Sequence, residues 1–166
     1  MRKLALFIGI ISILLSLNAC EEIQKELIGE YHYQVSGHVV LNDVRDLILN
    51  PEKGNLEIIK KDAKTLMLIF FAEDGNTYTT TATIEGEVLV LAPFYKLLPV
   101  NYYTHESTLL SGTISVLHEE NYQVVVYGMG ELYDDTIIFS LQYSGEELNS
   151  GTKLIGKNIT LIAKNK

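Results

Sequence analysis

Apolar and polar residues alternate in short runs along most of the chain from residue 30 to residue 164. The runs are rich in β-branched and aromatic residues and are separated by Gly, Asn and Asp, a pattern typical of β-strands. We expect strands near residues 30–41, 55–60, 64–72, 76–84, 87–92, 108–117, 121–128, 135–143 and 154–164. Residues 23–28 are predicted to form one or two helical turns.

Three of these runs show a period of two directly. Because side chains alternate across a strand, each such run has one dry face and one wetter face. The predicted dry faces carry Tyr31, Tyr33, Val35, Val39 and Leu41 in the first run, Tyr78, Ala82 and Ile84 in the fourth, and Ile137, Phe139, Leu141 and Tyr143 in the eighth.

The connections between the runs are short and polar. Gly75 and Gly86 stand where a tight hairpin turn needs a positive φ, and His118–Asn121 is predicted as a further turn. Short turns pair sequence neighbours, so the fold class is all-β, an antiparallel up-and-down meander of eight to nine strands. Closure into a barrel removes exposed strand edges and favours a β-barrel over the alternative, a two-sheet β-sandwich.

The first twenty residues have the pattern of an export signal. Arg2 and Lys3 precede an uncharged, mostly apolar run over residues 4–17, a length that suits a signal peptide and is short for a membrane span. The run ends in Leu17-Asn18-Ala19-Cys20, which resembles the lipobox of bacterial lipoproteins; an ordinary secretory signal with a chance cysteine is the alternative. We therefore expect a signal peptide over residues 1–19, a lipidated tether over 20–28 and a barrel domain over 29–166.

The lipobox resemblance implies a lipid anchor on Cys20, the single cysteine of the chain. More than one acyl chain gives stable membrane binding, and the resemblance to bacterial lipoproteins implies a location at the cell outer membrane. Signal removal takes two of the 13 basic residues and none of the 21 acidic ones, which changes the net charge from −8 to −10. This charge excludes docking on anionic lipid and argues against a nucleic-acid groove. Glu21 and Glu22 either resemble the surface-export tags of Bacteroidetes lipoproteins or are a solvated tether.

The start of the first strand carries a further resemblance. Gly29-Glu30-Tyr31 resembles the Gly-x-Trp entry of lipocalins and other calycins, with Tyr31 in the Trp position. Residues 112–139 are similar to the hairpins of small Bacteroidetes lipoproteins with calycin-like or lipocalin-like β-barrels. The chain departs from calycins in having no Trp and no clear counterpart of the late basic residue that covers it; Lys164 is the one late candidate. The resemblance implies an up-and-down barrel with one open end.

The sequence offers little catalytic or metal-binding chemistry. His32 and His38 share a predicted strand face but stand six residues apart, roughly 20 Å, too far to chelate a metal. No nucleophile elbow or phosphate-binding motif occurs, and the adjacent carboxylates fall in predicted turns, where acids are usually solvated. We expect no enzyme activity, no metal and no cofactor. Asp135-Thr136-Ile137 resembles a Bacteroidetes O-glycosylation site at Thr136.

Residues 93–105 form the segment that is most suggestive of function. Two of the three prolines fall here, which predicts a loop, and a loop of this length in a compact domain usually has a role. The loop is expected either to plug the barrel end or cover an edge strand, with its aromatic residues in the core, or to act as a flap over the barrel mouth. The candidate ligand-binding residues are Phe94, Tyr95, Tyr102 and Tyr103 in this segment, with Tyr31 and Tyr33 of the first strand facing the interior.

Two functions remain open from the sequence. The first is a non-enzymatic, lipid-anchored barrel that binds a small apolar or sugar-like ligand at its mouth, oriented by tyrosine hydroxyls. The second is a structural or interaction module that binds other envelope proteins and has no small-molecule ligand. It predicts a packed core and an exposed apolar patch.

Overall fold

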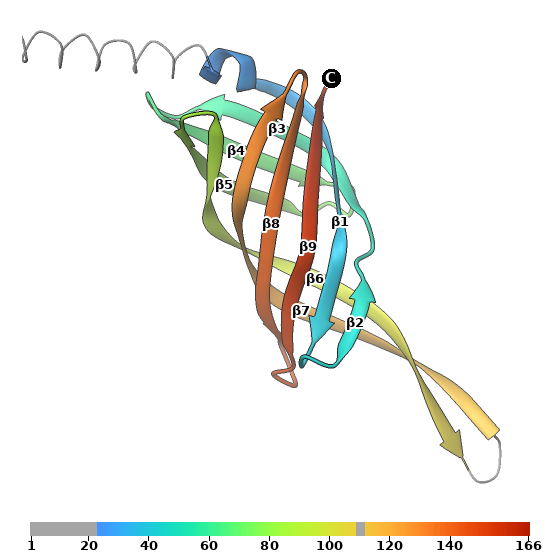
Figure 1. Cartoon of the computed structure of the whole chain (residues 1–166). Coiled ribbons are helices and arrows are strands. Elements are labelled where there is room, and N and C mark those ends of the chain that lie inside the picture. The colour runs from blue at the N-terminus through green and yellow to red at the C-terminus, as the bar shows by residue number, and fades with distance from the viewer. Residues whose placement is uncertain (1–22, 109–111) are drawn as a thin grey trace, which may run out of the picture.

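The computed structural model describes residues 23–108 and 112–166 (Figure 1). These residues form a short helix over 23–27 and nine strands. The strands are β1 (Gly29–Leu41), β2 (Arg45–Ile48), β3 (Glu52–Lys60), β4 (Thr65–Ala72), β5 (Thr77–Glu85), β6 (Val88–Thr108), β7 (Gly112–Tyr133), β8 (Thr136–Glu147) and β9 (Lys153–Asn165).

The strands form a closed antiparallel barrel. From β3 to β9 each strand pairs with the next, and β1 pairs with β9 along its length, so the sheet returns to its start. β2 and β3 both pair with β1, His38 opposite Ile48 and Val35 opposite Glu52, and therefore act as one kinked barrel strand. Counted in this way, the barrel wall has eight strands. The predicted all-β antiparallel meander and its closure are confirmed.

The barrel has two different ends. The short helix, the turns after β3, β5 and β7, and the C-terminus meet at one end, here called the helix end (Figure 1). The turns after β1, β4 and β8 meet at the other end, from which β6 and β7 project; it is here called the arm end. Chain direction alone therefore places the segment after the predicted lipid anchor and the β6–β7 connection at opposite ends.

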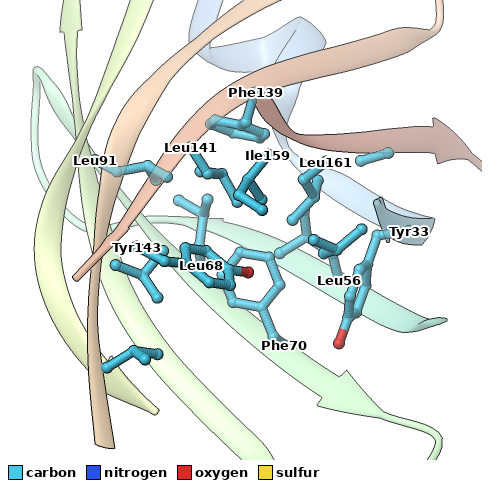
Figure 2. Packing of buried hydrophobic residues seen from close by; sticks show 14 of the residues in the cluster. Tyr33, Leu56, Leu68, Phe70, Leu91, Phe139, Leu141, Tyr143, Ile159 and Leu161 are labelled. Carbon is cyan, nitrogen blue, oxygen red and sulfur yellow. The ribbon is translucent and has the colours of Figure 1, made fainter. Parts of the chain in front are cut away.

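Alternating side chains fill the barrel interior. The three predicted dry faces are confirmed, since their residues are buried except Tyr78, which is half-buried. Figure 2 shows side chains from several strands meeting in the middle of the barrel. Tyr33 and Phe70 meet edge to face with ring centres 5.4 Å apart. The interior is a packed core of aromatic and aliphatic side chains.

The helix over residues 23–27 closes the helix end. Leu27 is buried against the core, and the Tyr31 hydroxyl donates to the Leu27 carbonyl at 3.0 Å. The buried Gln24 amide donates to the Asp62 carbonyl in the β3–β4 turn at 2.8 Å. These contacts fix residues 23–28 to the barrel, so this part of the expected tether is docked on the domain.

The segment over residues 93–105 is a strand, and the predicted loop is wrong. β6 runs unbroken from Val88 to Thr108. Its ladder with β7 has an irregularity between Leu91 and Phe94, which places Pro93 at a β-bulge. Pairing with β5 ends at Leu91, so beyond it β6 has a free edge that tolerates Pro99. The prolines that predicted a loop occupy positions that a strand accepts.

A long two-stranded hairpin projects beyond the barrel at the arm end (Figure 1). β7 pairs with β8 only from Tyr122 onward, which leaves residues 100–108 and 112–120, here called the arm, paired with each other alone. Nine residues of strand extend about 30 Å. The predicted turn at His118–Asn121 is wrong, because these residues lie within β7.

The predicted signal peptide, Cys20, Glu21 and Glu22 lie outside the described residues. Across the part of the chain that the structure does describe, no helix has the length and hydropathy needed to cross a bilayer.

Candidate ligand site at the mouth of the barrel

The β6 bulge turns a lysine into the barrel. Before the bulge the odd-numbered Leu89 and Leu91 face inward, and after it the even-numbered Phe94, Lys96 and Leu98 do. Lys96 is only 5% exposed, and its strand position is fixed by pairing with Val124 in β7. A buried ammonium group needs a charged partner, because desolvation of a lone charge is costly.

Glu52 provides that partner from across the barrel. Lys96 Nζ donates to Glu52 Oε2, and the Tyr33 hydroxyl donates to Glu52 Oε1 at 3.1 Å. Side-chain exposure is 3% for Lys96 and 21% for Glu52, so the cation is enclosed while the carboxylate borders solvent. The two oxygens of one carboxylate are thus divided between two donors.

Two further tyrosines enclose the ammonium group. Lys96 Nζ lies 5.3 Å from the centre of the Tyr78 ring and 5.4 Å from that of Tyr143, a favourable cation–π arrangement. Burial raises the pKa of Tyr78 to about 12, and the Glu52 charge adds to this effect. Burial and the same charge also raise the pKa of Tyr33 and of Tyr143. All three hydroxyls are therefore protonated at neutral pH.

A cleft at the arm end borders this cluster at Glu52. β5 pairs with β6 only over residues 82–85 and 88–91. Beyond this ladder the two strands are joined by the Thr80 hydroxyl, which donates to the Ala92 carbonyl at 2.8 Å. The cleft has a volume of about 230 Å³. Its walls are the break between β2 and β3, the β4–β5 turn and β6, through Leu49, Asn50, Pro51, Glu52, Lys53, Ala72, Glu73, Asp74, Leu97, Leu98, Pro99 and Asn101.

Beyond Glu52, side chains occupy nearly all the space around the Lys96 cluster. The void around the Lys96 cluster measures about 10 Å³, roughly the space of a single water molecule. Glu52 borders both this void and the cleft. Glu52 therefore separates the cleft from the Lys96 cluster, and a ligand would have to bind in the mouth instead of in a central cavity.

The six predicted ligand-binding residues do not form one site. Tyr33 and the half-buried Phe94 lie in the interior near the cleft, with Phe94 stacked on Phe70 at 6.0 Å between ring centres. Tyr31 is buried at the helix end. The remaining three, Tyr95, Tyr102 and Tyr103, lie on the outer wall or on the arm.

Tyr102 belongs to a separate cluster at the base of the arm. Its ring stacks on His118 at 4.8 Å, and its hydroxyl donates to Glu120 Oε1 at 2.8 Å. The Tyr122 hydroxyl donates to the other Glu120 oxygen at 2.5 Å. Arg45 of β2 lies over the Tyr102 ring. Tyr95 and Tyr103, which are 69% and 64% exposed, point away from the interior.

The sequence contained a signal for Lys96 that the loop prediction obscured. Phe94, Lys96, Leu98 and Val100 occupy alternate positions, so the lysine stands within an apolar period of two. A charged residue in such a series is a candidate for a buried, paired group. Its partner Glu52 follows Pro51 and had no comparable signal, because only the fold brings residues 44 positions apart together.

Two other features of the barrel bear on ligand and metal binding. One further hollow, about 550 Å³, lies on the outer wall between β1, β3 and β9. Apart from the buried Tyr33, its polar side chains, among them His32, Lys53 and Lys164, are exposed. Such an open surface lacks the enclosed polar anchors of a ligand site. Among the described residues, no three His, Cys, Asp or Glu side chains come close enough to hold a metal ion.

Comparison with known proteins does not define a family for this chain. No family model matches it, and no curated protein matches it. Among solved structures, it is similar to EF1p2_mFAP2b bound to DFHBI, with 9% identity, a TM-score of 0.49, and coverage of 86% of this chain and 95% of that one. It is also similar to a redesigned beta barrel, with 13% identity, a TM-score of 0.40, and coverage of 86% and 94%.

Proposed function

We propose that this chain is a non-enzymatic, lipid-anchored protein of the bacterial outer membrane whose barrel binds a small ligand at its mouth. The observation that carries the proposal is the cleft that Glu52 lines, with Lys96 and the Tyr33 hydroxyl bound to the same carboxylate behind it. Small-ligand sites combine apolar contacts with well-placed polar groups, and the residues that line this cleft are six apolar and six polar or charged ones. The hydroxyl that would orient the ligand is then that of Tyr33 and not those of the arm tyrosines, Tyr102 and Tyr103.

The anchor and the cleft are compatible in space. Under the proposal the lipid is carried by Cys20, and the docked helix begins at Ile23, three positions later. The helix end of the barrel then faces the membrane, and the cleft opens at the opposite end, toward the aqueous phase. Mass spectrometry of the mature protein tests the anchor, because an unmodified Cys20 thiol would reject it.

A matched pair of substitutions tests the cleft. Asn50→Trp fills the cleft from an exposed position, whereas Asn55→Trp places the same bulk on the exposed side of β3 outside it. We expect at least one of hexanol, octyl glucoside or hexanoate to raise the melting temperature of the wild type and of Asn55→Trp but not of Asn50→Trp. Equal shifts in all three proteins, or no shift in any, would reject ligand binding at this site.

The arm favours a second function, an interaction module for other envelope proteins. Exposed apolar side chains gather on the outer face of β6 and β7, namely Tyr95, Leu97, Tyr103, Leu117, Tyr127 and Met129. Both outer edges of the arm also lack a strand partner, and such edges accept added strands. Tyr103→Ser/Leu117→Ser would then abolish co-purification of one reproducible envelope protein while leaving cleft binding unchanged.

A further inference from the structure

We infer that the ligand of the mouth cleft is a small carboxylate, whose head group replaces the Glu52 carboxylate between Lys96 and Tyr33. The inference rests on the proposed ligand-binding function and names the chemical class of its ligand. The structure holds an anion site that is already built and is filled by a side chain of the protein itself.

The donors of this site are fixed. Lys96 is held by the β6–β7 ladder, and its side chain is 3% exposed. Tyr33 lies in β1, is buried, and pairs with Gly54 in β3. An ammonium and a hydroxyl group divide the two oxygens of one carboxylate between them, as they do with Glu52. Charge-assisted hydrogen bonds of this kind favour a planar anion with two acceptor oxygens.

Glu52 is the part that can move. It is the first residue of β3, follows Pro51, and stands where the register against β1 shifts. Its side chain is 21% exposed and borders the cleft. A ligand carboxylate that enters the cleft can take over both donors while Glu52 turns outward into water. One anion replaces another, so the buried ammonium group stays neutralised throughout.

The charge and size of the site define the ligand further. Lys96 is the one cation that lines the void among the described residues, so the site neutralises a single negative charge. Glu73 and Asp74 at the cleft rim oppose an incoming anion and Lys53 offsets one of them, so the buried ammonium must supply the attraction.

The cleft walls indicate a short apolar tail. The volume of about 230 Å³ is below the usual range of drug-sized sites, about 300–1,000 Å³. Leu49, Leu97 and Leu98 provide apolar contacts. Because the interior beyond Glu52 is full, the tail lies in the cleft and does not enter the core. Hexanoate is a probe of suitable size and charge, and hexanol is its neutral counterpart.

Calorimetric titration of the purified protein tests the inference. Glu52→Ala removes the carboxylate that competes with the ligand for Lys96 and Tyr33. Hexanoate should therefore bind to this variant about tenfold or more tightly than to the wild type, a factor that corresponds to the free energy of one charge-assisted hydrogen bond. Lys96→Met keeps the length of the side chain without its charge and should abolish hexanoate binding. Lys53→Met, a lysine on the cleft rim, is the matched control and should change the affinity less than threefold.

The outcomes separate the inference from the function on which it rests. If hexanol binds as tightly as hexanoate, or if Lys96→Met binds hexanoate like the wild type, the carboxylate inference is overturned while the cleft remains a ligand site. If neither compound binds to the wild type or to Glu52→Ala, both are overturned. Should Lys96→Met fail to fold, the comparison of Glu52→Ala with the wild type decides, and equal hexanoate affinity overturns the inference.

Discussion

The Arg45 guanidinium group lies over the Tyr102 ring, 4.4 Å from its centre. Arg45 belongs to the short strand β2, and Tyr102 stands on β6 just beyond the barrel. The contact therefore joins the β1–β2 hairpin to the base of the arm. The same Tyr102 ring also stacks on His118 of β7. Beyond this point no other strand of residues 23–108 and 112–166 pairs with the arm.

Arg45→Ala is expected to loosen the arm without unfolding the barrel. A partly exposed cation–π contact contributes about 0.5–1 kcal/mol, and here it acts at one point of the arm. Hydrogen exchange should become faster in residues 100–105 and 113–120, with the melting temperature nearly unchanged. Lys157→Ala, an exposed cation on β9, is the control. Faster exchange throughout the barrel would contradict a local role of Arg45.

Stability is expected to fall at alkaline pH. The pKa values of Tyr33, Tyr78, Tyr122 and Tyr143 are raised, mainly by burial, with that of Tyr78 at about 12. An unfolded tyrosine ionises near pH 10, so above this pH the unfolded state holds fewer protons than the folded state. The contribution of these tyrosines to the free energy of unfolding should be constant below pH 10 and should decrease as the pH rises toward 12.

Denaturant titrations at several pH values check this prediction, with tyrosinate absorbance as an independent readout. Tyr143→Phe removes one buried hydroxyl that must stay protonated, so the decrease above pH 10 should be less steep in this variant. The same variant at pH 7 is its own control, since all these hydroxyls are protonated there. An unchanged slope would contradict the assignment of Tyr143 to the alkaline transition.

A side chain at position 54, in the wall of the barrel, is expected to destabilise the protein. A Cβ atom at this position would lie 2.1 Å from the Phe71 carbonyl oxygen and 2.9 Å from the Tyr33 ring. The backbone of β4 cannot yield as a side chain can, so Gly54→Ala should destabilise the protein by about 1–3 kcal/mol, as overpacking usually does. Gly29→Ala, where the nearest atom is 3.9 Å away, is the matched control. Denaturant midpoints compare the two.

The sequence predicted the closed barrel because its signal is local. Alternation such as Ile137, Phe139 and Leu141 against polar neighbours fixes which side of a strand faces the core, and short turns fix which strands pair. The residues on these faces are buried as expected. Such information is repeated in every strand, so a single ambiguous segment does not change the fold.

The site could not be predicted in the same way. Pro93 and Pro99 disfavour a central strand, yet a bulge and a free edge accommodate them, and both features depend on where β5 stops pairing. The bulge also decides that Lys96 points inward, because one extra residue exchanges the two faces of a strand. The contact between Lys96 and Glu52 spans 44 positions and follows only from closure of the barrel.

The Glu52–Lys96 pair is expected to be asymmetric in its contribution to stability. Removing the carboxylate leaves an enclosed ammonium group without a counter-ion, whereas removing the ammonium leaves a carboxylate that already borders water. Breaking a buried pair from one side costs about 3–5 kcal/mol, so Glu52→Gln should approach this value and Lys96→Met should cost clearly less.

The double variant Glu52→Gln/Lys96→Met completes the test. It removes both charges, so it should recover much of the stability that Glu52→Gln alone loses, which gives a large coupling free energy between the two positions. Denaturant midpoints of the wild type, both single variants and the double variant measure it. Additive losses would mean that the ammonium group is solvated after Glu52 is removed, and the enclosed anion site on which carboxylate binding depends would not exist.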